Sequence, residues 1–256
     1  MVPRFLFAGL VAWAALAAPA QAPEAPPKKP DAAPEKSEAP PEKPAYEPTS
    51  RYVPRDVEGW TVLVHQRLLE GEKKDLGAET LKVLAAHLHL VNRMVPAKAL
   101  ERLRQVRIWV EADSKDVVCM CYHPSREWLA DHGFNPEKAK GVELGGPANF
   151  LSWTKHQFAM VLHELAHGYH HQVLGYDRAD VKEAYERAKE SKSYDDVLYF
   201  DGTRKRAYAM NNDQEYFAET TEAFFGTNDM YPFVRAELKV HDPGMYDVLR
   251  KAWGVE

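Results

Sequence analysis

Residues 163–167 read His-Glu-Leu-Ala-His, an H-E-x-x-H pattern. On an α-helix, side chains four residues apart project from the same face, so His163 and His167 can offer two imidazoles to one ion. Glu164 lies about 100° around the helix, where its carboxylate can reach a metal-bound water rather than the metal. The pattern therefore requires a helix and predicts two ligands and the general base of a hydrolytic zinc site.

A catalytic zinc ion takes three protein ligands and keeps one position open, so a third ligand must come from elsewhere in the chain. Glu215, Glu219 and Glu222 are spaced at i, i+4 and i+7, one face of a predicted helix over 212–225. Such spacing more often marks a solvated acidic face. Here the aromatic residues of the same stretch favour a core helix. We expect Glu215 to bind the metal and Glu219 to accept a hydrogen bond from the far nitrogen of a ligand histidine.

The H-E-x-x-H pentapeptide lies in a run from Ser152 to Leu174 whose apolar residues recur at steps of three and four. This spacing predicts one amphipathic helix, with Ser152 as N-cap and Gly175 just after its end. His163 and His167 then lie at the edge of the buried face. The alternative is two satisfied core histidines with an exposed glutamate between them.

Two further histidines, His170 and His171, continue around the same helix and are rival ligands. His170 lies about 10 Å along the helix axis from His163, so a straight helix cannot bring both to one ion. The longer zinc pattern H-E-x-x-H-x-x-G-x-x-H is excluded, because His170 replaces its glycine and Val173 replaces its last histidine.

The start of the chain predicts export. Arg4 precedes an apolar run over 5–18, and Ala20-Gln21-Ala22 is a small-x-small cleavage site, so residues 1–22 are typical of a secretory signal peptide. An uncleaved membrane anchor is the alternative, and we expect no stable membrane insertion after cleavage. Residues 23–50 hold nine of the 18 prolines and predict a disordered Pro/Lys/Glu/Ala-rich linker. Residues 51–256 suffice for one domain, in the periplasm, cell envelope or extracellular space.

Charge and cysteine content exclude other classes. A net charge of −5 without a basic stripe argues against a nucleic-acid partner. The only cysteines, Cys119 and Cys121, are two residues apart in an extended segment, at or beyond the reach of a disulfide. A metal role for these thiols with His123 is conceivable, but two small buried thiols are the simpler interpretation.

Periodicity and turn residues predict a mixture of helices and short strands without regular β-α alternation, which indicates the α+β class. The predicted strands are 60–65, 107–111, 117–122, 141–144 and 197–200. The predicted helices are 76–95, 125–132, 152–174, 180–189, 212–225 and 243–253.

The H-E-x-x-H pentapeptide, Tyr208–Met210 and the E-Y-F-A-E run at Glu215–Glu219 together resemble the catalytic domain of anthrax lethal-factor-type zinc peptidases. These enzymes are gluzincins, and the strong matches cover roughly residues 151–226. The region from Phe224 to Asp242 is also similar to a group of uncharacterised exported bacterial proteins. The resemblance implies a zincin-like fold, one Zn²⁺ per chain on His163, His167 and Glu215, and a Tyr208 hydroxyl that stabilises the oxyanion or protonates the leaving amine.

These features predict an exported zinc metallopeptidase acting on peptides or proteins, with Glu164 as general base. The segment 141–149 precedes the metal helix and is a candidate for pairing with extended substrate, as a strand there does in gluzincins. Two alternatives remain open. One is a zinc amidase acting on a non-protein amide such as a cell-wall bond, and the other is a catalytically silent zinc-binding envelope module.

Overall fold

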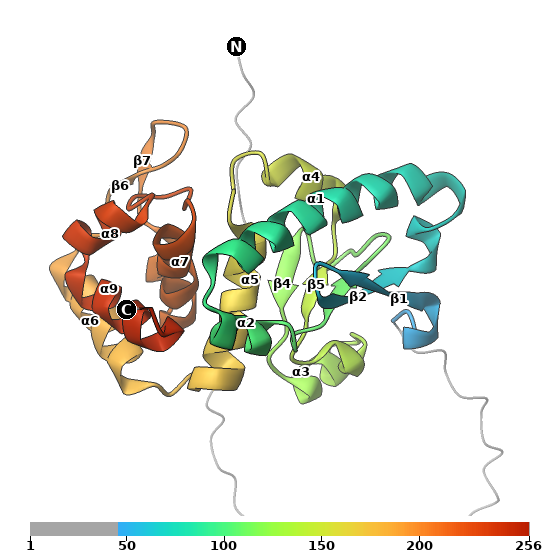
Figure 1. Ribbon diagram of the computed structural model, residues 1–256, viewed down its shortest axis with the longest axis horizontal. Helices are drawn as coiled ribbons and strands as arrows, with labels where there is room; N and C mark the ends of the chain where they lie inside the picture. Colours follow the sequence, from blue (N-terminus) through green and yellow to red (C-terminus); the bar gives the residue numbers. More distant parts are fainter. Residues whose placement is uncertain (1–45, 256) are drawn as a thin grey trace, which may run out of the picture. The chain divides into compact units, whose positions relative to one another are not determined.

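The computed structural model describes residues 46–255, and their central element is a five-stranded sheet of order β1-β2-β3-β5-β4 (Figure 1). β2, β3 and β5 run parallel, and the edge strands β1 and β4 run antiparallel to their neighbours. The strands are β1 (Tyr52–Val57), β2 (Trp60–His65), β3 (Ile108–Val110), β4 (Met120–Tyr122) and β5 (Val142–Leu144). A separate hairpin is formed by β6 (Val197–Leu198) and β7 (Arg204–Lys205).

The helices pack on both sides of a central helix, α5 (Met160–Tyr169). On one side, α5 contacts α1, α2, β4 and β5, and on the other it packs against α7. In Figure 1, α6, α8 and α9 gather around α7. The remaining helices are α1 (Lys74–Met94), α2 (Ala97–Leu103), α3 (Arg126–Asp131), α4 (Pro147–Trp153), α6 (Ala179–Ser191), α7 (Asp213–Phe225), α8 (Arg235–His241) and α9 (Pro243–Trp253). The predicted α+β class is confirmed.

The sheet separates an apolar side from a polar one. Alternate residues of the parallel strands, among them Val64, Ile108 and Leu144, join the core with α1 and α5. Successive side chains of a strand point to opposite faces, so Glu143 of β5 lies on the other face. Glu143 is only 1% exposed, so this second face is buried as well.

The single helix expected over 152–174 is wrong, because the structure divides it. α4 ends at Trp153, where the Thr154 hydroxyl donates to the Phe150 carbonyl at 2.7 Å and the amides of His156 and Gln157 fold back to the Trp153 carbonyl. α5 starts only at Met160, and Ser152 is therefore not its N-cap. The expected end is confirmed, since a π-helical turn, η5 (His170–Leu174), closes at Gly175 with φ +82°.

The folded part begins slightly before the predicted boundary at Arg51. Asn135 donates hydrogen bonds to the Glu47 carbonyl at 3.3 Å and to the Thr49 hydroxyl at 3.0 Å. These two contacts join the end of the predicted linker to the domain. The predicted signal peptide and residues 23–45 lie outside the described residues. Among the described helices, none combines the length and apolar character needed to cross a membrane.

Candidate metal centre

Three donor atoms meet where α5 packs against α7. The Nε2 atom of His163 lies 3.0 Å from Glu215 Oε2 and 3.1 Å from His167 Nε2, and His167 Nε2 lies 3.3 Å from the same oxygen. The three residues form a group able to hold a metal ion. A tetrahedral zinc ion with bonds of about 2.0–2.1 Å separates its ligands by about 3.3 Å. The predicted ligand set therefore has the donor atoms and spacing that zinc requires.

Local structure explains how each helix presents its ligands. His163 and His167 are one turn apart on α5, which is apolar and almost wholly buried around them. The Asn212 side chain caps α7 by accepting a hydrogen bond from the Glu215 amide at 2.7 Å. This cap fixes the first turn of α7, from which the Glu215 carboxylate reaches the histidines.

The far nitrogen of His163 faces two more carboxylates of α7. Its Nδ1 atom lies 2.7 Å from Glu222 Oε1 and 3.7 Å from Glu219 Oε1. Glu219 in turn accepts a hydrogen bond from Asn228 at 3.2 Å. The predicted orienting partner, Glu219, is thus near His163, but the hydrogen-bonded carboxylate belongs to Glu222, one turn further along. The i, i+4, i+7 spacing places Glu222 on the same face but predicts no role for it.

The charges of the ligands depend on one another. Burial alone would lower the pKa of His163, but hydrogen bonds to Glu215 and Glu222 outweigh it and raise that pKa well above its ordinary value. Burial would raise the pKa of Glu215, yet hydrogen bonds from His163 and His167 hold it far below its ordinary value. A protonated imidazole beside a charged carboxylate is what such a cluster adopts without a cation.

The carboxylates of Glu219 and Glu222, behind the ligands, have too few cationic partners to balance their negative charge. Burial raises the pKa of both Glu219 and Glu222; the charge of Glu222 adds to the shift of Glu219, and the charge of Asp229 adds to both. Both glutamates are 5% exposed. A buried group of acids with few cationic partners is stabilised by a bound metal ion, which supports the fit of zinc to this centre.

Glu164 and Tyr208 border the same centre. After the larger effect of burial, the negative charge of Glu164 raises the pKa of Cys119 and that of Cys121. Tyr208 begins a 3-10 turn, η6 (Tyr208–Met210), and is half exposed. Burial of its hydroxyl and the charge of Glu215 raise its pKa to about 12. Tyr208 therefore lies within electrostatic range of the ligand Glu215, and Glu164 lies within range of Tyr208 and Glu222.

The rival histidines have other surroundings. His170 is fully buried, with its ring 4.6 Å from that of Phe217 and 5.0 Å from that of Tyr176, and burial lowers its pKa to about 3. His171 Nδ1 lies 2.8 Å from the Tyr122 hydroxyl. Neither belongs to a metal-capable group among residues 46–255.

Cys119, Cys121 and His123 do not converge on one point. The Cys119 thiol contacts Met160 Sδ at 3.4 Å, whereas the Cys121 thiol lies 3.5 Å from His123 Nε2. That same nitrogen is 2.7 Å from Glu143 Oε2. Burial raises the pKa of both thiols, which favours their protonated form; Cys119 is buried and Cys121 is partly exposed.

The strand expected to pair with substrate is not at the sheet edge. The strand within 141–149 is β5, which is covered by β3 on one side and β4 on the other. The edge strand next to β5 is β4. The Cys119 carbonyl accepts a hydrogen bond from the Gly145 amide at 2.8 Å, and the His123 amide donates to the Gly141 carbonyl at 3.0 Å, so both bonds point toward β5. By antiparallel alternation, the backbone groups of Met120 and Tyr122 therefore point away from the sheet.

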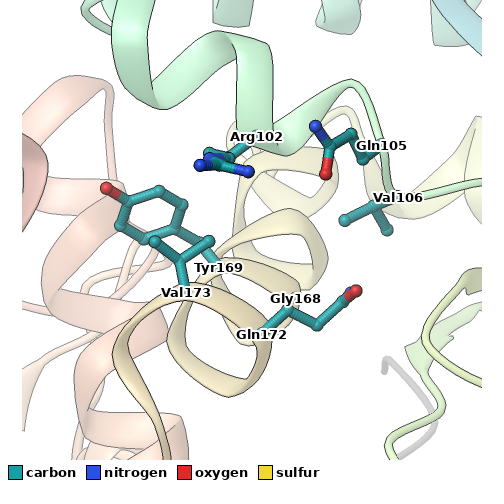
Figure 2. A pocket seen from close by; sticks show the side chains of 7 residues that line it. All are labelled: Arg102, Gln105, Val106, Gly168, Tyr169, Gln172 and Val173. Atoms are coloured by element: carbon teal, nitrogen blue, oxygen red, sulfur yellow. The ribbon is translucent and has the colours of Figure 1, made fainter.

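A separate pocket lies between α2 and the end of α5, as Figure 2 shows. Its lining residues are Arg102, Gln105, Val106, Gly168, Tyr169, Gln172 and Val173. None of them belongs to the ligand group, so this pocket is not part of the metal centre.

No protein-family model matches this sequence, and no curated protein matches it either. The function is therefore inferred from the geometry of the centre and from the motifs that form it.

Proposed function

We propose that the chain is an exported zinc-dependent metallopeptidase of the lethal-factor-like gluzincin type, with a zincin-like fold. The observation that carries this proposal is the approach of His163 Nε2, His167 Nε2 and Glu215 Oε2 to within 3.3 Å of one another. Two imidazoles and one carboxylate are a donor set used by catalytic zinc sites that keep an open position.

Each side chain of the centre has a chemical role in this proposal. A zinc ion held by the three ligands would lower the pKa of a coordinated water and polarise the scissile carbonyl. Glu164 takes a proton from the attacking water and passes it to the leaving amine. Tyr208 donates a hydrogen bond to the oxygen on which negative charge develops. Glu222 accepts a hydrogen bond from the Nδ1–H of His163 and so orients the ligand nitrogen Nε2.

The free edge of β4 favours an extended peptide as substrate. Strand addition to an exposed edge supplies main-chain hydrogen bonds without requiring a particular sequence. The outward backbone groups of Met120 and Tyr122 offer such an edge, and β4 packs on α5, which carries His163 and His167. A peptide bound there would lie along the wall of the metal centre beside Glu164.

The test is to incubate the zinc-loaded full chain with a peptide library and, separately, with a cell-wall digest, and to analyse the products by mass spectrometry. We expect internal peptide cleavage by the wild type and none by Glu164→Gln, with zinc retained in both. Cleavage of cell-wall amides alone would instead identify a zinc amidase. A zinc-loaded protein that cleaves neither substrate would be a silent zinc-binding module.

A further inference from the structure

The face of the sheet turned away from α5 contains a second buried polar cluster, which we call the sheet network. Its members are Tyr52, Glu111, His123, Lys138 and Glu143, and each is at most 6% exposed. Charged side chains are seldom buried to this extent unless they are paired. None of the five has a role in the proposed chemistry, so the network requires another explanation.

The members form a continuous chain of contacts. The Tyr52 hydroxyl donates to Glu111. Lys138 Nζ lies 2.5 Å from Glu111 Oε1 and 3.0 Å from Glu143 Oε1, and His123 Nε2 lies 2.7 Å from Glu143 Oε2. Tyr52 belongs to β1 and His123 directly follows β4. The chain therefore joins the two edge strands of the sheet across its buried face.

β4 needs support beyond its own ladder. It pairs with β5 over three residue pairs. At the two ends of this ladder, the Gly145 amide donates to the Cys119 carbonyl at 2.8 Å and the Lys140 amide donates to the His123 carbonyl at 2.7 Å. A slip of one residue would turn every β4 side chain to the opposite face. Such a slip would remove His123 from Glu143 and leave a buried carboxylate with one partner fewer, which is costly. The contact between His123 and Glu143 thus selects the observed register.

The register of β4 determines the wall of the metal centre. Cys119, just before β4, touches Met160 in the first turn of α5 at 3.4 Å. We propose that His123, Glu143 and Lys138 are positioning residues, which hold β4 in the register that presents the backbone of Met120–Tyr122 to an extended peptide. The identity of the peptide rests on the proposed function, whereas the positioning of β4 rests on the sheet network alone.

The first test is amide hydrogen exchange, followed by NMR, on the full chain carrying His123→Ala. Loss of the contact should accelerate exchange at Lys140 and Gly145 by about tenfold or more, because the ends of the β4 ladder open more often. His132→Ala is the matched control, since His132 is an exposed histidine outside the network. Unchanged exchange at both amides in His123→Ala would overturn the proposal. If His123→Ala does not fold, Glu143→Gln, which keeps the side-chain shape, takes its place with the same expectation.

The second test separates positioning from general destabilisation. With a long peptide that reaches β4, His123→Ala should raise KM about tenfold, whereas turnover of a short substrate confined to the metal should stay within about twofold. His123→Gln, which can still donate to Glu143, should restore the KM of the long peptide. Equal losses on both substrates would contradict positioning. If the wild type cleaves no peptide, the proposed function fails, and the exchange experiment alone still decides the role of the network.

Discussion

Two buried polar clusters flank the interior of this protein, and they differ in how their charges are balanced. In the sheet network, Lys138 bridges Glu111 and Glu143, and His123 contacts Glu143 as well. In the metal centre, the ionisable partners of the α7 carboxylates are histidines, and the neutral Asn228 adds one hydrogen bond to Glu219. The sheet network is balanced by its own residues, whereas the ligand group would be balanced by a bound cation. Burial by itself therefore does not mark a functional site, but buried negative charge without enough cationic partners does.

The glutamates of the two clusters show the contrast directly. Burial would raise the pKa of Glu143, but hydrogen bonding to His123 and the charge of Lys138 outweigh it and lower that pKa. The pKa of Glu219 and that of Glu222 remain raised, because burial and neighbouring negative charge exceed the help from His163. Carboxylates of similar burial thus stay charged in one cluster and resist ionisation in the other.

The largest expected effect is the loss of turnover when the general base Glu164 is replaced. Glu164→Gln should lower kcat by about 10²–10⁴-fold while zinc stays bound, because only the general base is removed. Glu79→Gln, at an exposed position of α1, is the control and should match the wild type. The measurement is peptide turnover together with zinc content. Activity retained by Glu164→Gln would remove the base from the proposed mechanism.

Tyr208→Phe should reduce kcat by about 10²-fold and leave zinc affinity unchanged, because the variant loses one hydrogen bond to the developing oxyanion. Tyr122→Phe provides a comparison, since its hydroxyl contacts His171 and Gln172 outside the ligand group. Kinetics of both variants on one peptide would measure the difference. Wild-type turnover in Tyr208→Phe would mean that the Tyr208 hydroxyl is only solvated and has no part in catalysis.

Glu222→Gln should weaken zinc binding by about 10–100-fold, as expected for loss of the carboxylate that orients a ligand histidine. Glu219→Gln should have a smaller effect, because its carboxylate lies 3.7 Å from His163 Nδ1 rather than 2.7 Å. Competition with a chelator measures both affinities. A larger loss in Glu219→Gln would reverse the two roles and restore the partner predicted from the sequence.

Much of the centre could be predicted because its information is local. Helical spacing alone places His163 and His167 on one face of α5, and the cap at Asn212 marks the start of α7. The choice between Glu219 and Glu222 was not local, because both share a face of α7. It depends on the angle and depth at which α7 packs on α5, which spacing within one helix does not specify.

The fold was predictable where one strong signal dominated. The strand Trp60–His65 and the helix Pro243–Trp253 match the prediction at both ends. The predicted helix start at Ser152 was wrong and the true start at Met160 was missed, because apolar periodicity continues through a loop in which Phe158 is half exposed. The sheet network was invisible to sequence analysis, since Tyr52 and Glu143 are brought together only by strand order.

The two clusters should also respond to pH in opposite directions. In the metal-free chain, the raised pKa of His163 contributes stability that is fully present below about pH 6.5 and is lost as pH rises through the folded-state value. The lowered pKa of Glu143 contributes stability that is present above about pH 4.3 and is lost as pH falls through its folded-state value. Thermal unfolding of the metal-free wild type, His163→Ala and Glu143→Gln, measured from below about pH 4.3 to well above about pH 6.5, would separate the two contributions.

Zinc must displace the proton of His163, so its affinity should rise with pH until that imidazole is deprotonated. Titrations in buffers of different ionisation enthalpy would count the protons released. Zinc affinity that does not change between about pH 6 and pH 8 would contradict a ligand with a raised pKa.

The most direct test of the central claim is the zinc content of the purified full chain after dialysis. Wild type and Glu143→Gln should each retain about one zinc per chain, and Glu215→Ala should lose it. Full zinc occupancy in Glu215→Ala, with loss in Glu219→Ala or Glu222→Ala, would place the ion on the Nδ1 side of His163 and contradict the assignment.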